Sequence, residues 1–88
     1  MKDLTITVKN PGGLTSRSAA ELVEEANHYH SHISLKIETG EECDLKSIMN
    51  VFALPLISPE SKIVIICDGD DEDQAVLGFE KLSKAFKF

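Results

Sequence analysis

The sequence has no tryptophan, one tyrosine, two cysteines and no apolar run long enough to cross a membrane. The two cysteines, Cys43 and Cys67, fit no CxxC or zinc-site spacing, which favours reduced thiols over a disulfide framework or a zinc-stabilised domain. The segment Met1–Val8 alternates polar and apolar residues and lacks the hydrophobic block of a signal peptide. We therefore expect a cytoplasmic protein.

Basic charge is also scarce. Nine Lys and Arg residues against fifteen Asp and Glu residues leave a net charge of −6. Nucleic acids and anionic membranes attract Lys and Arg, so this balance disfavours both as direct partners and suits a basic protein partner better. With 88 residues, 42% of them hydrophobic, we expect a single domain over residues 1–88 that has room for one thin core and one site.

Alternating apolar residues predict four strands. Leu4–Val8 and Ile33–Ile37 show the period of two that is typical of a strand with one buried face. The turn Thr39-Gly40 after the second strand predicts a hairpin with a short strand over Glu42–Leu45. Lys62–Cys67 is rich in β-branched residues and predicts the fourth strand.

Three segments show helical spacing. These are Ser16–Ala26, a short apolar helix after Ser47 that stops before Pro55, and a last helix that follows the acidic Asp68–Asp71. The last helix has an apolar stripe: Ala75, Phe79, Leu82 and Phe86. The order β-α-β-β-α-β-α predicts an α+β fold, a two-layer open-faced sandwich in which three helices cover one face of a four-stranded antiparallel sheet.

The segment NPGGLTSRSAAELVEEA, Asn10–Ala26, is typical of an anion site. A turn leads into a helix N-terminus, where backbone N–H groups, the positive end of the helix and Arg17 come together. The residues of this segment do not reveal which group would accept a phosphate.

His28, His30 and His32 are the other conspicuous cluster. On one continuous strand they would share a face and could bind zinc or nickel. They span a helix end, a loop and a strand start, so we expect surface histidines and no metal site, with Tyr29 packing inward. Their role stays open.

Three segments carry a resemblance to a known family. GLTSRSAAELVEEAN, LKSIMNVFAL and GDDEDQAV, in this order and spacing, resemble the active-site segment, the regulatory-serine segment and the start of the last helix of HPr. HPr is the small phosphocarrier of the bacterial sugar phosphotransferase system. The resemblance covers essentially the whole chain.

The resemblance implies a domain that has the carrier's shape without its reaction. Thr15 stands where the family has its phosphorylated histidine, and Ser18 where it has a proline, while Arg17 is kept as a phosphate-binding residue. Ser47 matches the regulatory serine. This is the pattern of the Crh-like branch of the family, which keeps the serine and lacks the histidine.

The same resemblance implies partners and a function in carbon catabolite regulation. An HPr-type kinase/phosphorylase would modify Ser47, and a catabolite-control transcription regulator would read the product, with Arg17, Ser16, Ile48 and Met49 as the contact surface. The resemblance implies no enzymatic activity and no cofactor. The alternative is a degenerate phosphotransferase component that docks to enzyme I or to sugar-transport enzymes, as a competitor or with Thr15 or Ser16 as substitute acceptor.

Simpler interpretations of the same residues remain open. Ser47 can be an N-cap only, Arg17 a solvated side chain, and Ile48 and Met49 part of the core, with Val51, Phe52 and Leu54 as other candidates for the buried helix face. On the last strand, Val64 and Ile66 would face away from the helices and form an apolar patch on the open sheet face. That patch predicts a possible homodimer.

Overall fold

A computed structural model describes residues 1–55 and 57–86, with the side chain of Phe86 outside the description. The predicted element order is confirmed: β1 (Lys2–Thr7), α1 (Ser16–Ala26), β2 (His32–Ile37), β3 (Glu42–Asp44), α2 (Ile48–Phe52), β4 (Lys62–Asp68) and α3 (Glu72–Phe86). In this part of the chain, no helix has the length and hydrophobicity needed to cross a membrane.

The four strands form one antiparallel sheet in the order β1-β4-β2-β3, which leaves β1 and β3 at the edges. The inward-facing rows are apolar across the sheet. Ile6 pairs with Ile63, which pairs on its other side with Ile37. The register thus places one hydrophobic face against the helices, as the alternation of the strands predicts.

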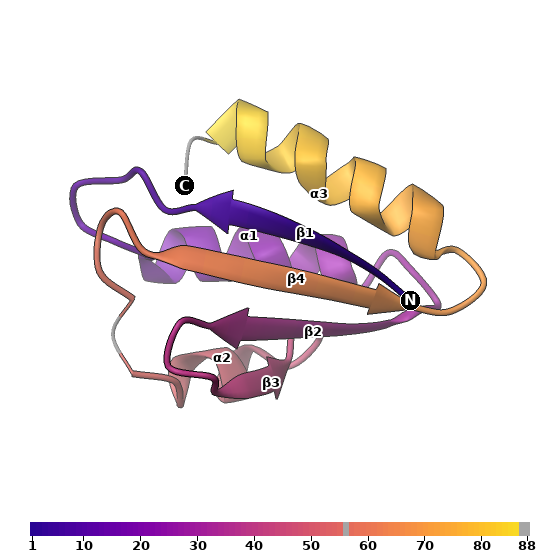
Figure 1. Ribbon diagram of the computed structural model, residues 1–88, viewed down its shortest axis with the longest axis horizontal. Helices are drawn as coiled ribbons and strands as arrows, with labels where there is room; N and C mark the ends of the chain where they lie inside the picture. The colour runs from indigo at the N-terminus through magenta and orange to yellow at the C-terminus, as the bar shows by residue number, and fades with distance from the viewer. Residues whose placement is uncertain (56, 87–88) are drawn as a thin grey trace.

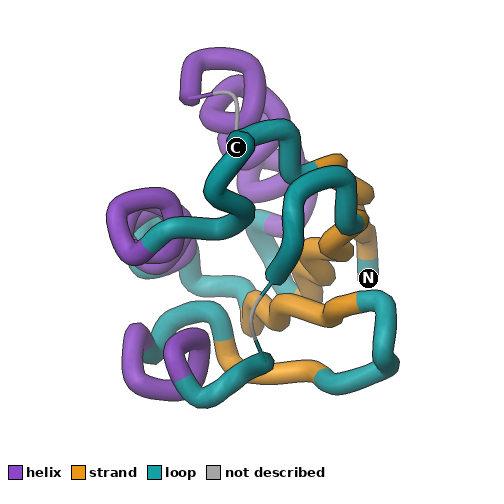
Figure 2. Tube along the Cα trace, turned by 90° about the vertical axis from the view of Figure 1, so that its left-hand side faces the viewer, coloured by secondary structure: helices purple, strands orange, loops and turns teal. Residues whose placement is uncertain are grey.

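The helices cover one face of the sheet and leave the other open, which confirms the two-layer α+β fold (Figures 1 and 2). Helix α3 packs against β1 and β4, and α1 contacts both α2 and α3. The core between the layers contains fully buried side chains from both, including Leu22, Ile33, Leu35, Ile65 and Phe79.

The open sheet face is less apolar than the sequence suggests. Val64 and Ile66 face away from the helices as predicted, and both are half-buried. Their cross-strand neighbours are polar: Val64 pairs with Thr5 and Lys36, and Ile66 with Asp3 and Ser34. The apolar patch is therefore limited to these two side chains on β4.

Candidate functional site

The turn before α1 is held in place by a close backbone approach. Gly13 has a φ of +76°, and a Cβ built on it would lie 2.1 Å from the carbonyl oxygen of Ile57. The next residue, Leu14, donates its N–H to that same oxygen at 3.1 Å. Only glycine fits both the conformation and the contact. This packing fixes where the chain enters α1.

Thr15 is the N-cap of α1. Its backbone is extended, with φ −85° and ψ 167°, and its hydroxyl accepts the N–H of Ser18 at 3.2 Å. The same hydroxyl lies 3.2 Å from the Ser18 hydroxyl, to which it donates. Both hydrogen-bonding roles of the Thr15 hydroxyl are therefore used inside the protein, in the ordinary way of a capping residue.

Ser16 and Arg17 are exposed on the first turn of α1. Among residues 1–55 and 57–86, no carboxylate forms an ion pair with Arg17. A shallow hollow lies beside this turn, between the start of α1 and the end of α2, and its lining includes Thr15, Phe52 and Pro55. The predicted anion-binding groups are thus together at the helix start, with an apolar rim.

Ser47 is the N-cap of the five-residue helix α2, as predicted. Its hydroxyl accepts the N–H of Asn50 at 3.4 Å, and its carbonyl oxygen accepts the N–H of Val51 at 3.2 Å. No acceptor for the Ser47 hydroxyl proton occurs in the described part of the chain. Ser47 is half-buried, and the hydrogen bond of its hydroxyl to Asn50 lies at the surface.

The backbone around Ser47 is tied to the turn between α1 and β2. The Lys46 ammonium donates to the carbonyl oxygen of Tyr29 at 2.7 Å, and the side-chain amide of Asn27 donates to the carbonyl oxygen of Lys46 at 3.2 Å. Asp44 adds two bonds, since it accepts the N–H of Lys46 through its carboxylate and the N–H of Ser47 through its carbonyl oxygen. The regulatory-serine candidate therefore sits on a well-bonded support.

The two predicted contact residues after Ser47 differ in exposure. Met49 is 73% exposed, whereas Ile48 is half-buried and packs against the core. Val51 is buried, but the prediction that Phe52 is a candidate for the buried face is wrong, because its side chain is 54% exposed. A helix of five residues has only one side on the core, so residues next to the buried Val51 turn outward. Met49 and Phe52 form the exposed apolar part of α2.

The three histidines do not come together around one point. His28 Nδ1 lies 3.9 Å from Glu25, His32 Nε2 lies 3.2 Å from the Ser34 hydroxyl, and the backbone of His30 is bound elsewhere. Among the described residues there is no group of three His, Cys, Asp or Glu side chains placed to bind a metal. Tyr29 does pack inward, with its ring 6.3 Å from that of Phe79.

Asp71 has a role that the sequence reasoning missed. Its carboxylate accepts the N–H groups of His30 at 2.8 Å and Ser31 at 2.9 Å, and also the Ser31 hydroxyl. Hydrogen bonds from the Ser31 side chain and the His30 backbone lower the pKa of Asp71 from 3.8 to about 2. The acidic run Asp68–Asp71 predicts only favourable charge at the start of α3. A contact across forty residues of sequence has no local signal that could reveal it.

The comparison with protein families gives a match over nearly the whole chain. Residues 2–85 match the family model PTS-HPr, described as the PTS HPr component phosphorylation site. Phosphocarrier protein HPr of Mycoplasma pneumoniae is 36% identical over 76 residues, which are 86% of this chain and 85% of that protein. HPr-like protein Crh of Bacillus subtilis is 35% identical over 78 residues, 89% of this chain and 86% of that protein.

Solved structures agree with these matches. The structure of the histidine-containing phosphocarrier protein of Mycoplasma has a TM-score of 0.85 and 32% identity, and covers 93% of this chain and 91% of its own. The structure of Bacillus subtilis Crh has a TM-score of 0.64 and 34% identity, and covers 94% of this chain and 90% of its own. That Crh is described as a catabolite repression protein that forms a domain-swapped dimer. The chain belongs to the HPr family.

Proposed function

We propose that this protein is a cytoplasmic regulatory member of the HPr family, which is switched by phosphorylation of Ser47 and does not carry phosphate at Thr15. The observation that carries the proposal is the contrast between two hydroxyls at two helix starts. The Thr15 hydroxyl both donates and accepts a hydrogen bond inside the protein. The Ser47 hydroxyl accepts one long hydrogen bond, and its proton has no acceptor among the described residues.

The chemistry at position 15 argues against a carrier. The three histidines of the chain are His28, His30 and His32, so none lies in the segment that resembles the family's active site. A neutral imidazole, with a pKa of about 6.5, is nucleophilic at neutral pH, whereas a threonine hydroxyl needs an adjacent base. The neighbours of the Thr15 hydroxyl are the N–H and hydroxyl of Ser18, and neither is a base. A phosphothreonine ester is also too stable to pass its phosphoryl group onward.

Ser47 suits a switch that leaves the fold intact. A phosphate there would add roughly two negative charges at the positive end of α2, where anions are stabilised. The bonds that hold Lys46 and Asp44 do not use the Ser47 hydroxyl, so the support would persist. Modification would change the charge beside the exposed side chains of Met49 and Phe52. An HPr-type kinase/phosphorylase would add this phosphate, and a catabolite-control transcription regulator would bind the product, with Arg17 and Ser16 at the start of α1 as further contacts.

Binding of such a regulator tests the surface. We expect the Ser47-phosphorylated protein to bind a catabolite-control regulator at least about tenfold more tightly than the unmodified protein, since charge-assisted hydrogen bonds to Arg are strong. Replacement Met49→Ser should weaken that complex while leaving stability nearly unchanged, because the side chain is 73% exposed. Leu77→Ser on α3 is the matched control, at 56% exposure away from α2. Equal binding with and without phosphate would contradict the proposal.

A homodimer is part of the proposal. Crh structures described as dimers support it, although the open sheet face of this chain offers only Val64 and Ile66 as apolar contacts. Sedimentation velocity over a range of concentrations would measure it. A protein that stays monomeric at millimolar concentration would remove the homodimer and leave the phosphorylation proposal standing.

A second function, docking to enzyme I without acting as a carrier, is favoured by the exposed Arg17 at the start of α1. The Thr15→His variant separates the two. If the docking surface survives, this variant gains phosphate from phosphoenolpyruvate and enzyme I, and Thr15→Asn, which has no nucleophile, gains none. If Thr15→His stays unmodified although it folds, the docking surface has diverged together with the acceptor.

A further inference from the structure

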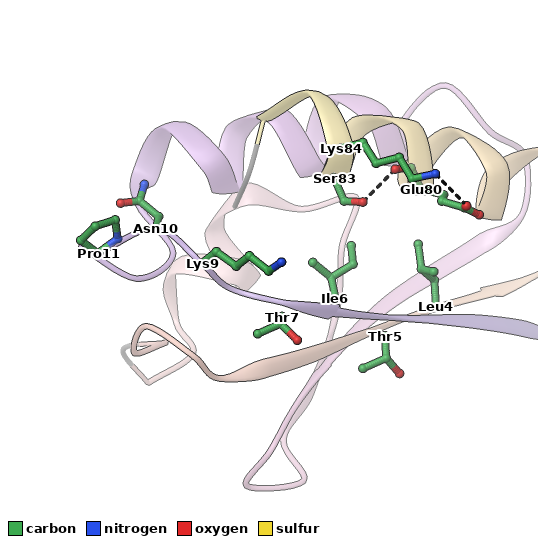
Figure 3. A pocket seen from close by; sticks show the side chains of 10 residues that line it. All are labelled: Leu4, Thr5, Ile6, Thr7, Lys9, Asn10, Pro11, Glu80, Ser83 and Lys84. Atoms are coloured by element: carbon green, nitrogen blue, oxygen red, sulfur yellow. Dashed lines mark hydrogen bonds and ion pairs between the residues drawn. The ribbon is translucent and has the colours of Figure 1, made fainter.

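A groove lies between the edge strand β1 and helix α3 (Figure 3), on the side of the molecule away from α2 (Figure 1). It has a volume of about 900 Å³. Leu4 and Ile6 point from β1 towards α3, while Thr5 and Thr7 point the opposite way (Figure 3). Further lining comes from α3 and from the loop after β1: Lys9, Asn10, Pro11, Glu80, Ser83 and Lys84.

The groove is open because one side of α3 changes from apolar to polar along the helix. Val76, in the first half of the helix, packs against the core. One and two turns later the same side of α3 carries Glu80 and Ser83, and the short Ser83 side chain donates to the carbonyl oxygen of Glu80 at 2.8 Å. Leu4 below them is only half-buried. A larger apolar residue at position 83 would fill this space.

The groove runs along a free sheet edge. Among the residues that the structure describes, strand β1 has β4 on one side and no strand on the other. An edge strand presents unpaired N–H and C=O groups that can pair with an added strand. The inward-facing apolar rows of the sheet end at β1, beside the groove. These rows pair Leu4 with Ile65 and Ile6 with Ile63. An added strand would continue both the hydrogen bonding and the apolar rows.

The charge at one end of the groove is positive in an acidic protein. The Lys9 side chain lies along the groove, pointing towards Ile6 (Figure 3). Lys9 makes no ion pair among residues 1–55 and 57–86, whereas Lys84 lies 3.4 Å from Glu80. Two ammonium groups and one carboxylate therefore leave the Lys9 end of the groove able to attract an acidic group.

We propose that this groove binds an extended segment of a partner protein, which joins β1 as an antiparallel fifth strand. Alternate side chains of that segment are apolar and lie on the half-buried Leu4 beneath Ser83. Antiparallel pairing is the more stable arrangement, and it places the N-terminal end of the segment beside Lys9. The segment therefore carries an acidic residue at its N-terminal end.

Synthetic peptides with blocked ends test this on the whole protein. We would titrate Asp-Val-Thr-Val-Thr-Val, its reverse Val-Thr-Val-Thr-Val-Asp, and a lysine version Lys-Val-Thr-Val-Thr-Val into labelled protein and follow backbone amide shifts by NMR. We expect shifts in β1 and in the second half of α3, and binding about threefold weaker for each of the other two peptides, as for an exposed ion pair. The first peptide methylated on its backbone nitrogens should not bind.

Variants locate the site. Ser83→Leu should abolish binding by filling the groove, and Lys9→Gln should remove the preference for the acidic peptide. Lys36→Gln, on the open face of β2, is the matched control and should change nothing. Absence of shifts in β1 at millimolar peptide, or equal binding of the methylated peptide, would overturn the proposal. Shifts in β1 and the second half of α3 that grow with protein concentration when no peptide is present would show a second copy of the chain at this edge, which would also overturn it.

Discussion

The two helix starts of this molecule, at Thr15 and at Ser47, have the same cap chemistry and different surroundings. Thr15 begins an eleven-residue helix, and its hydroxyl is bonded to both the N–H and the hydroxyl of Ser18 at 3.2 Å. Ser47 begins a five-residue helix, and its hydroxyl accepts one bond of 3.4 Å from Asn50. The first hydroxyl is committed to structure, and the second is the more available for modification.

The supports of the two caps also differ. The Thr15 cap is held by backbone packing of Gly13 on Ile57. The segment before Ser47 is bonded to Asp44 and, through the side chains of Lys46 and Asn27, to the end of α1 and the turn that follows it. We infer that the Thr15 site serves the fold and the Ser47 site can change its charge without cost to the fold.

The largest expected effect on stability comes from Gly13→Ala. The new Cβ would lie 2.1 Å from the Ile57 carbonyl oxygen at a φ of +76°. Strain at positive φ and overpacking together should lower the free energy of unfolding by about 3 kcal/mol. Gly40→Ala is the control, since it has a φ of +95° with nothing within 4 Å, and should cost only about 1 kcal/mol. Equal losses in urea unfolding would show that the close approach at Gly13 does not matter.

Removal of the two cap hydroxyls should have unequal effects. Thr15→Ala should destabilise the protein by about 1 kcal/mol, and Ser47→Ala by about 0.5 kcal/mol, because the Ser47 bond is longer and its helix shorter. Thr15→Ser keeps the cap and should cost a few tenths of a kcal/mol at most. Urea midpoints for the three variants measure this. A larger loss for Ser47→Ala would reverse the contrast.

The last expected effect is a change in how stability falls at acid pH. The folded pKa of Asp71 is about 2, below its usual 3.8, because of hydrogen bonds from Ser31 and His30. A lowered pKa contributes stability that is present above about pH 4 and is lost as the pH falls towards 2. Asp71→Asn should therefore reduce the stability at neutral pH, and the stability of this variant should fall less between pH 4 and 2. Thermal unfolding at a series of pH values measures both effects. The control is Asp70→Asn, a change at the exposed neighbouring residue, which should leave the fall in stability between pH 4 and 2 unchanged.

Most of the fold could be predicted from periodicity, and the failures have physical causes. The four strands and the long helices repeat their pattern over five or more residues or adjoin a clear turn, and their order was right. Helix α2 is too short for its period to show which side is buried, so the outward position of Phe52 was missed. Asp71 binds a turn forty residues away, and the β1–α3 groove depends on Ser83 facing an edge strand. Such contacts are set by tertiary packing and leave no local pattern.

At the candidate site, sequence reasoning predicted the Ser47 cap, a helix that begins at Ser16, and the apolar segment after Ser47. The Ser47 cap and the helix start at Ser16 are confirmed, whereas the capping role of Thr15 was not predicted. The burial of Ile48 against the exposure of Met49 could not be predicted, because both fit either side of a helix of five residues. The phosphorylation of Ser47 remains a prediction.

The most direct test is to map phosphate on the intact protein after two parallel reactions, one with ATP and an HPr-type kinase and one with phosphoenolpyruvate and enzyme I. Intact mass and peptide mapping should reveal a single acid-stable phosphate on Ser47 in the first reaction, none in the same reaction of Ser47→Ala, and none in the second reaction. A phosphate on Thr15 or Ser16, or transfer from phosphoenolpyruvate to the unmodified protein, would contradict the account.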